Sequence, residues 1–153
     1  MQLKNNISIV IFTCLSILSF PVFGKSHLKN GNSYAQVVNG SVQRTMPGMK
    51  GMAPYDQYTF TLVWKSVHTP SMFYWKGDDK WMKCRVAILS KHSEEIVKKG
   101  DTIMLSPIRN GQDVIPEQVL KSNTTSLVLT TSKNEWLYIP VKKIDKKPVL
   151  IMP

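Results

Sequence analysis

The chain is poor in the residues that hold disulfide-rich and metal-binding proteins together. Among its 153 residues only two are cysteine and only three are histidine. Cys14 lies in an apolar N-terminal run, which leaves Cys84 alone in the rest of the chain, so no internal disulfide framework can form. The fold must therefore rest on an apolar core.

Acidic residues are also scarce, with ten Asp and Glu against twenty Lys and Arg, for a net charge of +10. A basic chain favours anionic partners, such as an acidic glycan, an anionic lipid or a charged envelope protein. His68 and His92 are isolated, and Cys84 falls on the apolar side of its strand pattern. Since no catalytic triad or paired acid is evident, we expect a protein that is not an enzyme.

The N-terminus has the pattern of a secretory signal peptide. A short positive region ends at Lys4, an apolar run follows from Ile7 to Phe23, and Gly24 precedes a polar stretch. We therefore expect a signal peptide over 1–24, a flexible segment over 25–33 and a single domain over 34–153. Export to the periplasm, cell envelope or extracellular space follows from this, with at most peripheral membrane contact. It also argues against nucleic acid as the ligand.

The stretch from Tyr58 to Leu89 predicts the centre of the fold. Its first part alternates apolar and polar residues, which is the pattern of a strand with one buried face. A second alternating run covers 81–89, and the polar segment 76–80 between the two, with its glycine, predicts a hairpin. The residues expected on the buried faces are Tyr58, Phe60, Leu62, Trp64, Met82, Cys84, Val86 and Ile88.

The rest of the chain shows more short strand patterns separated by turn residues. A second hairpin is expected at 132–135, and a last strand at 148–152. Seven or eight short strands predict an all-β fold, which we interpret as an immunoglobulin-like antiparallel β-sandwich. A barrel is the alternative.

A loop rich in methionine is one candidate binding site. Two prolines and two glycines within 45–54 exclude a regular helix or central strand there. Thioether sulfur suits Cu(I), so this loop and a following turn predict a copper site. Its ligands would be Met46, Met49, Met52, His68 and Met72. The alternative is that these methionines only fill loop and core positions.

An aromatic and basic strand face is the second candidate. An exposed tryptophan flanked by cations can stack on sugars and pair with acidic groups. The residues expected to bind an acidic glycan are Trp75, Trp81, Lys83 and Arg85. The alternative is cross-strand packing within a second buried layer.

Two resemblances bear on these hypotheses. The chain resembles small exported β-sandwich proteins of Bacteroidetes-type bacteria in four segments, 58–62, 73–75, 99–103 and 148–153. That resemblance implies an immunoglobulin-like sandwich and transfers no site residues. The methionines and His68 also make the chain similar to periplasmic copper chaperones of the PCuAC type, in residue types only. The His-x-Met pair of that family is replaced here by His68-x-x-x-Met72.

Overall fold

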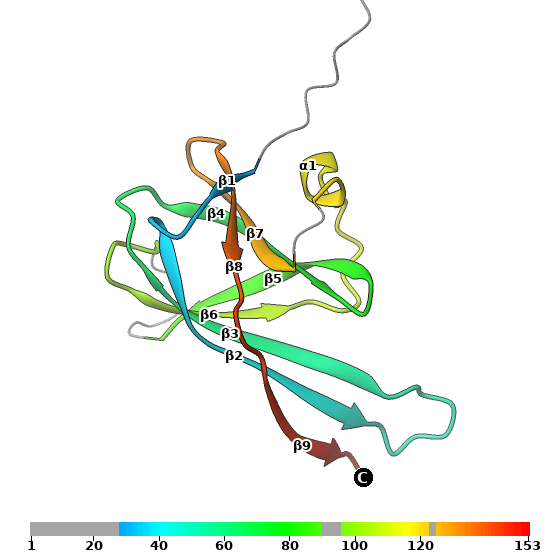
Figure 1. Ribbon diagram of the computed structural model, residues 1–153. Coiled ribbons are helices and arrows are strands. Elements are labelled where there is room, and N and C mark those ends of the chain that lie inside the picture. Colours follow the sequence, from blue (N-terminus) through cyan, green and yellow to red (C-terminus); the bar gives the residue numbers. More distant parts are fainter. Residues whose placement is uncertain (1–27, 90–95, 123–124) are drawn as a thin grey trace, which may run out of the picture.

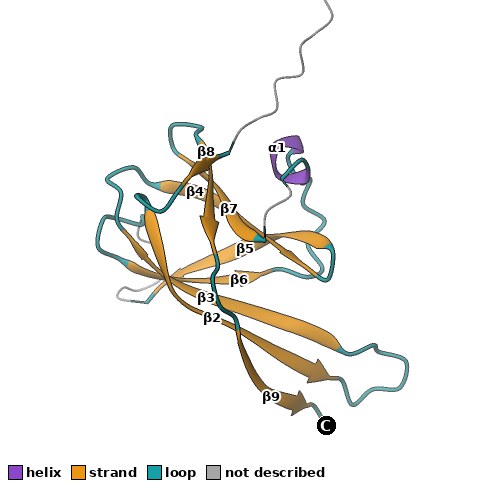
Figure 2. Ribbon diagram, viewed as in Figure 1, coloured by secondary structure: helices purple, strands orange, loops and turns teal. Residues whose placement is uncertain are grey.

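The computed structural model describes residues 28–89, 96–122 and 125–153 (Figure 1). The described chain is mostly strand, with one short helix (Figure 2). The elements in chain order are β1 Lys29–Asn30, β2 Ala35–Met46, β3 Tyr55–Trp64, β4 Pro70–Gly77, β5 Lys80–Ile88, β6 Thr102–Pro107, α1 Glu117–Leu120, β7 Ser126–Thr131, β8 Trp136–Pro140 and β9 Asp145–Ile151.

All nine strands belong to one sheet, in the order β1-β8-β7-β4-β5-β6-β3-β2-β9. The predicted all-β class is confirmed, whereas the two-sheet sandwich of seven or eight strands is wrong. The reason is that β5 pairs with a different strand along each half of its length. Its first part, Lys80 to Lys83, pairs with β4, and its second part, Cys84 to Ile88, pairs with β6. The sheet therefore curls as one surface instead of dividing into two.

The two terminal segments of the described chain run side by side and in the same direction. Lys29 and Asn30 of β1 pair in parallel with β8, and β2 pairs in parallel with β9. We call this line, between residues 29–46 and 136–151, the seam. Residues 28–33 were expected to be flexible, but they form β1 and the turn into β2. The expected signal peptide, 1–24, lies outside the described residues, as do 25–27.

The predicted alternation in β3 is confirmed. Phe60, Leu62 and Trp64 are fully buried, and they pack with residues of β4, β6, β7 and β8 inside the curled sheet. The ring centroids of Phe60 and Trp75 are 4.5 Å apart. Burial of this many aromatic and aliphatic side chains supplies most of the stabilisation that a chain without disulfides requires. In β5 the expected burial holds for Met82 and Cys84, whereas Val86 is 37% exposed and Ile88 is only partly buried.

Both predicted hairpins are present. Asp78 and Asp79 connect β4 to β5 with φ angles of 51° and 61°, the backbone of a two-residue turn whose twist matches that of the strands. Residues 132–135 connect β7 to β8, and Asn134 there has a φ of 59°. Asp and Asn tolerate this conformation because their short side chains can bond to the local backbone.

A second apolar cluster covers part of the outer face of the sheet. It contains four buried residues, one of them from α1, and partly buried Leu28, Ile115 and Trp136 pack against it. The four are Tyr74, Trp81, Val119 and Val128. In the described part of the chain no helix is long and apolar enough to cross a membrane.

Candidate functional site: the exposed tip of the sheet

The far end of the β2–β3 hairpin projects away from the curled sheet, and β9 runs beside it (Figure 1). We call residues 46–54 and 148–153 the tip, and the rest of the described chain the body. Every residue of the tip except Pro47 is exposed. The large apolar side chains exposed there are Met46, Met49, Met52, Val149, Leu150, Ile151 and Met152.

Strand β9 is unusual because all seven of its residues are exposed. Within the described residues it has β2 on one side and no strand on the other. Ile151 is 76% exposed, although isoleucine is normally one of the most buried residue types. Scattered single apolar residues on a surface need no explanation, but a contiguous group of them marks an interaction site.

Short contacts hold the two parts of the tip together. The backbone N–H of Met152 donates to the carbonyl of Met46 at 3.0 Å, and the side-chain amide of Gln43 donates to the carbonyl of Pro148 at 3.0 Å. Gly48 lies so close to Met152 and Pro153 that a Cβ at this position would collide with their backbone. The absence of a side chain at residue 48 therefore allows the C-terminus to dock on the loop.

Basic residues lie within the tip and next to it. Lys50 lies within the loop, and Lys146 and Lys147 lie in the exposed first half of β9. The Arg109 guanidinium stands over the Tyr55 ring, with 4.7 Å between its carbon and the ring centroid. Tyr55 and Arg109 also line a cleft of about 550 Å³ together with Met52, Ala53, Ile108 and Asn110.

Two acids lie near these cations, and each faces a basic residue. Asp56 is the cross-strand partner of Arg44, and Asp145 pairs with Lys143 at 2.7 Å. Lys50, Lys146, Lys147 and Arg109 therefore give the surroundings of the tip a positive charge. The tip thus combines exposed aliphatic side chains with cations.

The structure divides the five predicted copper ligands into two groups. Met46, Met49 and Met52 lie at the tip, before the start of β3, whereas His68 and Met72 follow the other end of that strand. A strand of ten residues spans roughly 33 Å, so the five do not form one site. The fold instead brings Met152 beside Met46, a pairing that sequence spacing could not reveal.

His68 and Met72 have local partners in the body. The backbone carbonyl of His68 accepts a hydrogen bond from the Trp64 indole at 2.9 Å. The centroid of the His68 ring is 6.4 Å from that of the Tyr34 ring. The Met72 sulfur accepts a hydrogen bond from the Tyr74 hydroxyl at 3.1 Å. Among the described residues, no group of three or more His, Cys, Asp or Glu side chains is placed to hold a metal ion.

The predicted glycan platform is not on the surface. Trp75 and Trp81 are 4% and 8% exposed, and they lie on opposite faces of the sheet, in the inner and outer clusters. Arg85 is exposed, and Lys83 lies 3.5 Å from Asp113. The expectation of exposed tryptophans is therefore wrong. The alternative of a second buried layer describes Trp81, whereas Trp75 lies in the main core. The exposed face was misjudged because α1 covers it from a distant part of the chain.

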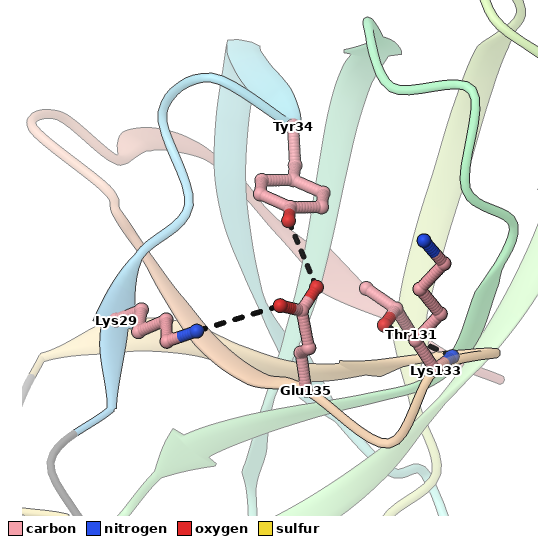
Figure 3. A network of polar contacts seen from close by, with 5 residues as sticks. All are labelled: Lys29, Tyr34, Thr131, Lys133 and Glu135. Atoms are coloured by element: carbon pink, nitrogen blue, oxygen red, sulfur yellow. Dashed lines mark hydrogen bonds and ion pairs between the residues drawn. The ribbon is translucent and has the colours of Figure 1, made fainter.

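Polar contacts fix the opposite end of the seam (Figure 3). The Glu135 carboxylate accepts a hydrogen bond from the Tyr34 hydroxyl at 2.8 Å and lies 3.4 Å from the Lys29 amine. The hydrogen bond from the Tyr34 hydroxyl has the largest effect on the pKa of Glu135 and lowers it. Desolvation opposes it by a smaller amount, and the hydrogen bond and charge of Lys29 lower the pKa further. The same hydrogen bond raises the pKa of Tyr34. These groups tie β1 and the start of β2 to the β7–β8 hairpin.

Between its two paired ends the seam leaves a cleft of about 460 Å³. Its walls come from 35–40 of β2 and from 139–145, and Lys65, Lys142 and Lys143 line it. Asp145 is the acid among these lining residues, and it is paired with Lys143. Three lysines and one acid thus line this cleft, whereas the large exposed side chains of the tip are mainly aliphatic.

Comparisons with protein-family models, with curated proteins and with solved structures found no match to this chain. The resemblances to exported Bacteroidetes-type proteins and to copper chaperones therefore stay predictions. The function must be argued from the surface of the molecule itself.

Proposed function

We propose that this chain is an exported, non-enzymatic binding or accessory module of the cell envelope, and that the tip is its contact surface. The observation that carries the proposal is the exposure of seven large apolar side chains on a projecting part of the sheet. Burying them on a partner stabilises a complex, while leaving them in water contributes little to folding. The predicted leader supports export.

A non-enzymatic role agrees with the state of the thiol. Cys84 is the free cysteine of the described residues, and it is 5% exposed on the core face of β5. Burial raises its pKa far above that of an ordinary thiol, so the nucleophilic thiolate is scarcely populated.

Cell fractionation tests the proposal. The chain expressed with its leader is expected to remain with the envelope, and the double variant Met49→Gln, Ile151→Gln is expected to be released into the soluble fraction. The matched control carries Val67→Gln and Val114→Gln, which change equally exposed apolar residues in the body. Equal retention of both variants would remove the tip as the contact surface, and a soluble parent chain would remove the envelope assignment.

Copper binding is a second candidate, favoured by one finding. The fold places a fourth methionine, Met152, beside the loop that holds Met46, Met49 and Met52. Several thioethers at one exposed position form a soft donor set of the kind that Cu(I) prefers. A Cu(I) competition titration decides this. The triple variant Met46→Leu, Met49→Leu, Met52→Leu should lose binding, and His68→Ala with Met72→Leu should keep it. Weak binding, unchanged in the triple variant, would end the copper hypothesis.

A further inference from the structure

The tip combines exposed aliphatic side chains with neighbouring basic residues. The aliphatic side chains belong to the 46–54 loop and to residues 149–152, and the ribbon of these two segments forms a projecting point (Figure 1). Cations lie next to that point, at Lys50, Lys146, Lys147 and Arg109. Apolar groups that enter the acyl boundary, with cations at the level of the headgroups, are the pattern of peripheral membrane binding.

We infer that the tip docks on the surface of an anionic phospholipid bilayer. The inference rests on the proposed role of the tip as the contact surface, and it names the partner. Met49, Met52 and Ile151, each more than half exposed, enter the boundary between headgroups and acyl chains. Lys146 and Lys147 remain at the headgroups, because a lysine stem can lie along apolar surface while its amine stays in water.

Charge complementarity favours a lipid surface over a second copy of the chain. Two copies would bring two strongly basic chains together, whereas an anionic bilayer attracts the same positive charge. The open edge strand β9 also carries Lys146, Lys147 and Pro148 directly after its first residue, and lysine and proline at a sheet edge oppose pairing with another strand. Lysine is moreover depleted from the cores of protein interfaces.

Vesicle co-sedimentation tests the inference with pure lipids, in the absence of any envelope protein. The purified chain should bind vesicles that contain phosphatidylglycerol and should bind pure phosphatidylcholine vesicles far less. The variant Lys146→Gln, Lys147→Gln should lower the partition coefficient by about tenfold or more, since each cation near an anionic surface contributes about fivefold. The matched control is Lys65→Gln with Lys76→Gln, two exposed lysines of the body, which should bind like the parent.

Apolar insertion is tested separately from charge. Met49→Gln with Ile151→Gln should lower vesicle binding at least tenfold, whereas the leucine triple variant of the copper test keeps the apolar surface and should bind as the parent does. Far-ultraviolet circular dichroism of each variant checks that the sheet is intact. Binding that is equal on neutral and anionic vesicles, or unchanged in the tip variants, would overturn the inference.

The outcomes also separate this inference from the proposed function. Envelope retention that depends on the tip, without vesicle binding, leaves the contact surface in place and replaces lipid by an envelope protein. Self-association that is lost in Ile151→Gln, again without vesicle binding, replaces lipid by a second copy. Loss of both tip-dependent retention and vesicle binding removes the proposed function together with the inference.

Discussion

Ile103 and Ile151 are the same residue in strands of the same sheet, yet their surroundings are opposite. Ile103 lies in β6, between β3 and β5, and is fully buried. Ile151 lies at the end of β9, has a strand on one side, and is 76% exposed. The body uses its aliphatic residues to hold the fold together, because the curl of the sheet encloses them. Those of the tip remain available for contact.

The comparison shows that an apolar pattern alone does not distinguish the two uses. What distinguishes them is the number of strands beside the residue and whether the sheet curls over it. Tyr55 and Trp64, at the two ends of β3, illustrate this: Trp64 is fully buried, while Tyr55 is half-buried under Arg109. Matched substitutions in the body and at the tip should therefore differ in thiol reactivity and in their effect on stability.

Thiol labelling should give the largest difference. In the folded protein Cys84 should react with a thiol reagent at least about a thousandfold more slowly than in denaturant. The reagent reaches this buried thiol only after local or global unfolding, which costs several kcal/mol. A cysteine introduced by Met49→Cys should react about as fast in the folded chain as in denaturant, since residue 49 is 69% exposed. Rapid labelling of Cys84 under native conditions would contradict its place in the core.

Truncation of the two isoleucines should separate the regions in stability. Ile103→Ala should lower the free energy of unfolding by about 2–5 kcal/mol, through lost burial and a residual cavity. Ile151→Ala should change it by less than about 0.5 kcal/mol, as expected of a surface position. Urea unfolding at one temperature measures both. A cost of several kcal/mol at Ile151 would mean that the tip is part of the folding core.

Sequence reasoning succeeded where the signal was local. The alternation in β3 and the turn at Asp78 and Asp79 depend on neighbouring residues, and both were predicted. It failed where distant segments meet. The parallel pairing of β1 with β8 and of β2 with β9 joins residues about a hundred positions apart, and no local pattern encodes it. A curled sheet and a sandwich share the same strand pattern.

The candidate site was predicted only in part. Composition alone predicts the methionine loop as a candidate site, but the pattern of Val149 to Met152 predicts only a last strand and not its exposure. A signal was present in Lys146, Lys147 and Pro148, because this combination is typical of a sheet edge. The glycan face failed for the opposite reason, since α1 covers Trp81 from another part of the chain.

A methyl group at Gly48 should loosen the C-terminal part of the tip. Gly48→Ala places a Cβ against the backbone of Met152 and Pro153, so amide exchange at Met152 should accelerate about tenfold while the body keeps its protection. Gly51→Ala in the same loop is the matched control. Gly51 has a φ of 91°, and no atom lies within 4 Å of a Cβ added there, so that substitution strains the loop without displacing the C-terminus. Unchanged exchange at Met152 in Gly48→Ala would contradict this docking.

The smallest effect is expected at the seam, and it depends on pH. The folded-state pKa of Glu135 is lowered, chiefly by the Tyr34 hydrogen bond, so its contribution to stability is present at neutral pH and is lost as pH falls through that lowered pKa. The folded-state pKa of Tyr34 is raised, so its contribution is present below the ordinary tyrosine pKa and is lost as pH rises through the raised one. The stability difference between the parent chain and Tyr34→Phe should therefore be constant near neutral pH and should shrink in acid and in strong base.

Urea midpoints of both proteins across the pH range measure that difference, and Lys29→Gln provides the comparison. Lys29 is a weaker cause of the lowered Glu135 pKa than Tyr34 is, so its removal should give a smaller loss with the same acid dependence. Exposed ion pairs are screened by salt, and the Lys29→Gln effect should fade as salt is added while the Tyr34→Phe effect persists. If the stability difference between the parent chain and Tyr34→Phe stays constant into acid, Glu135 does not hold the seam. Neither substitution is expected to change the structure of the tip.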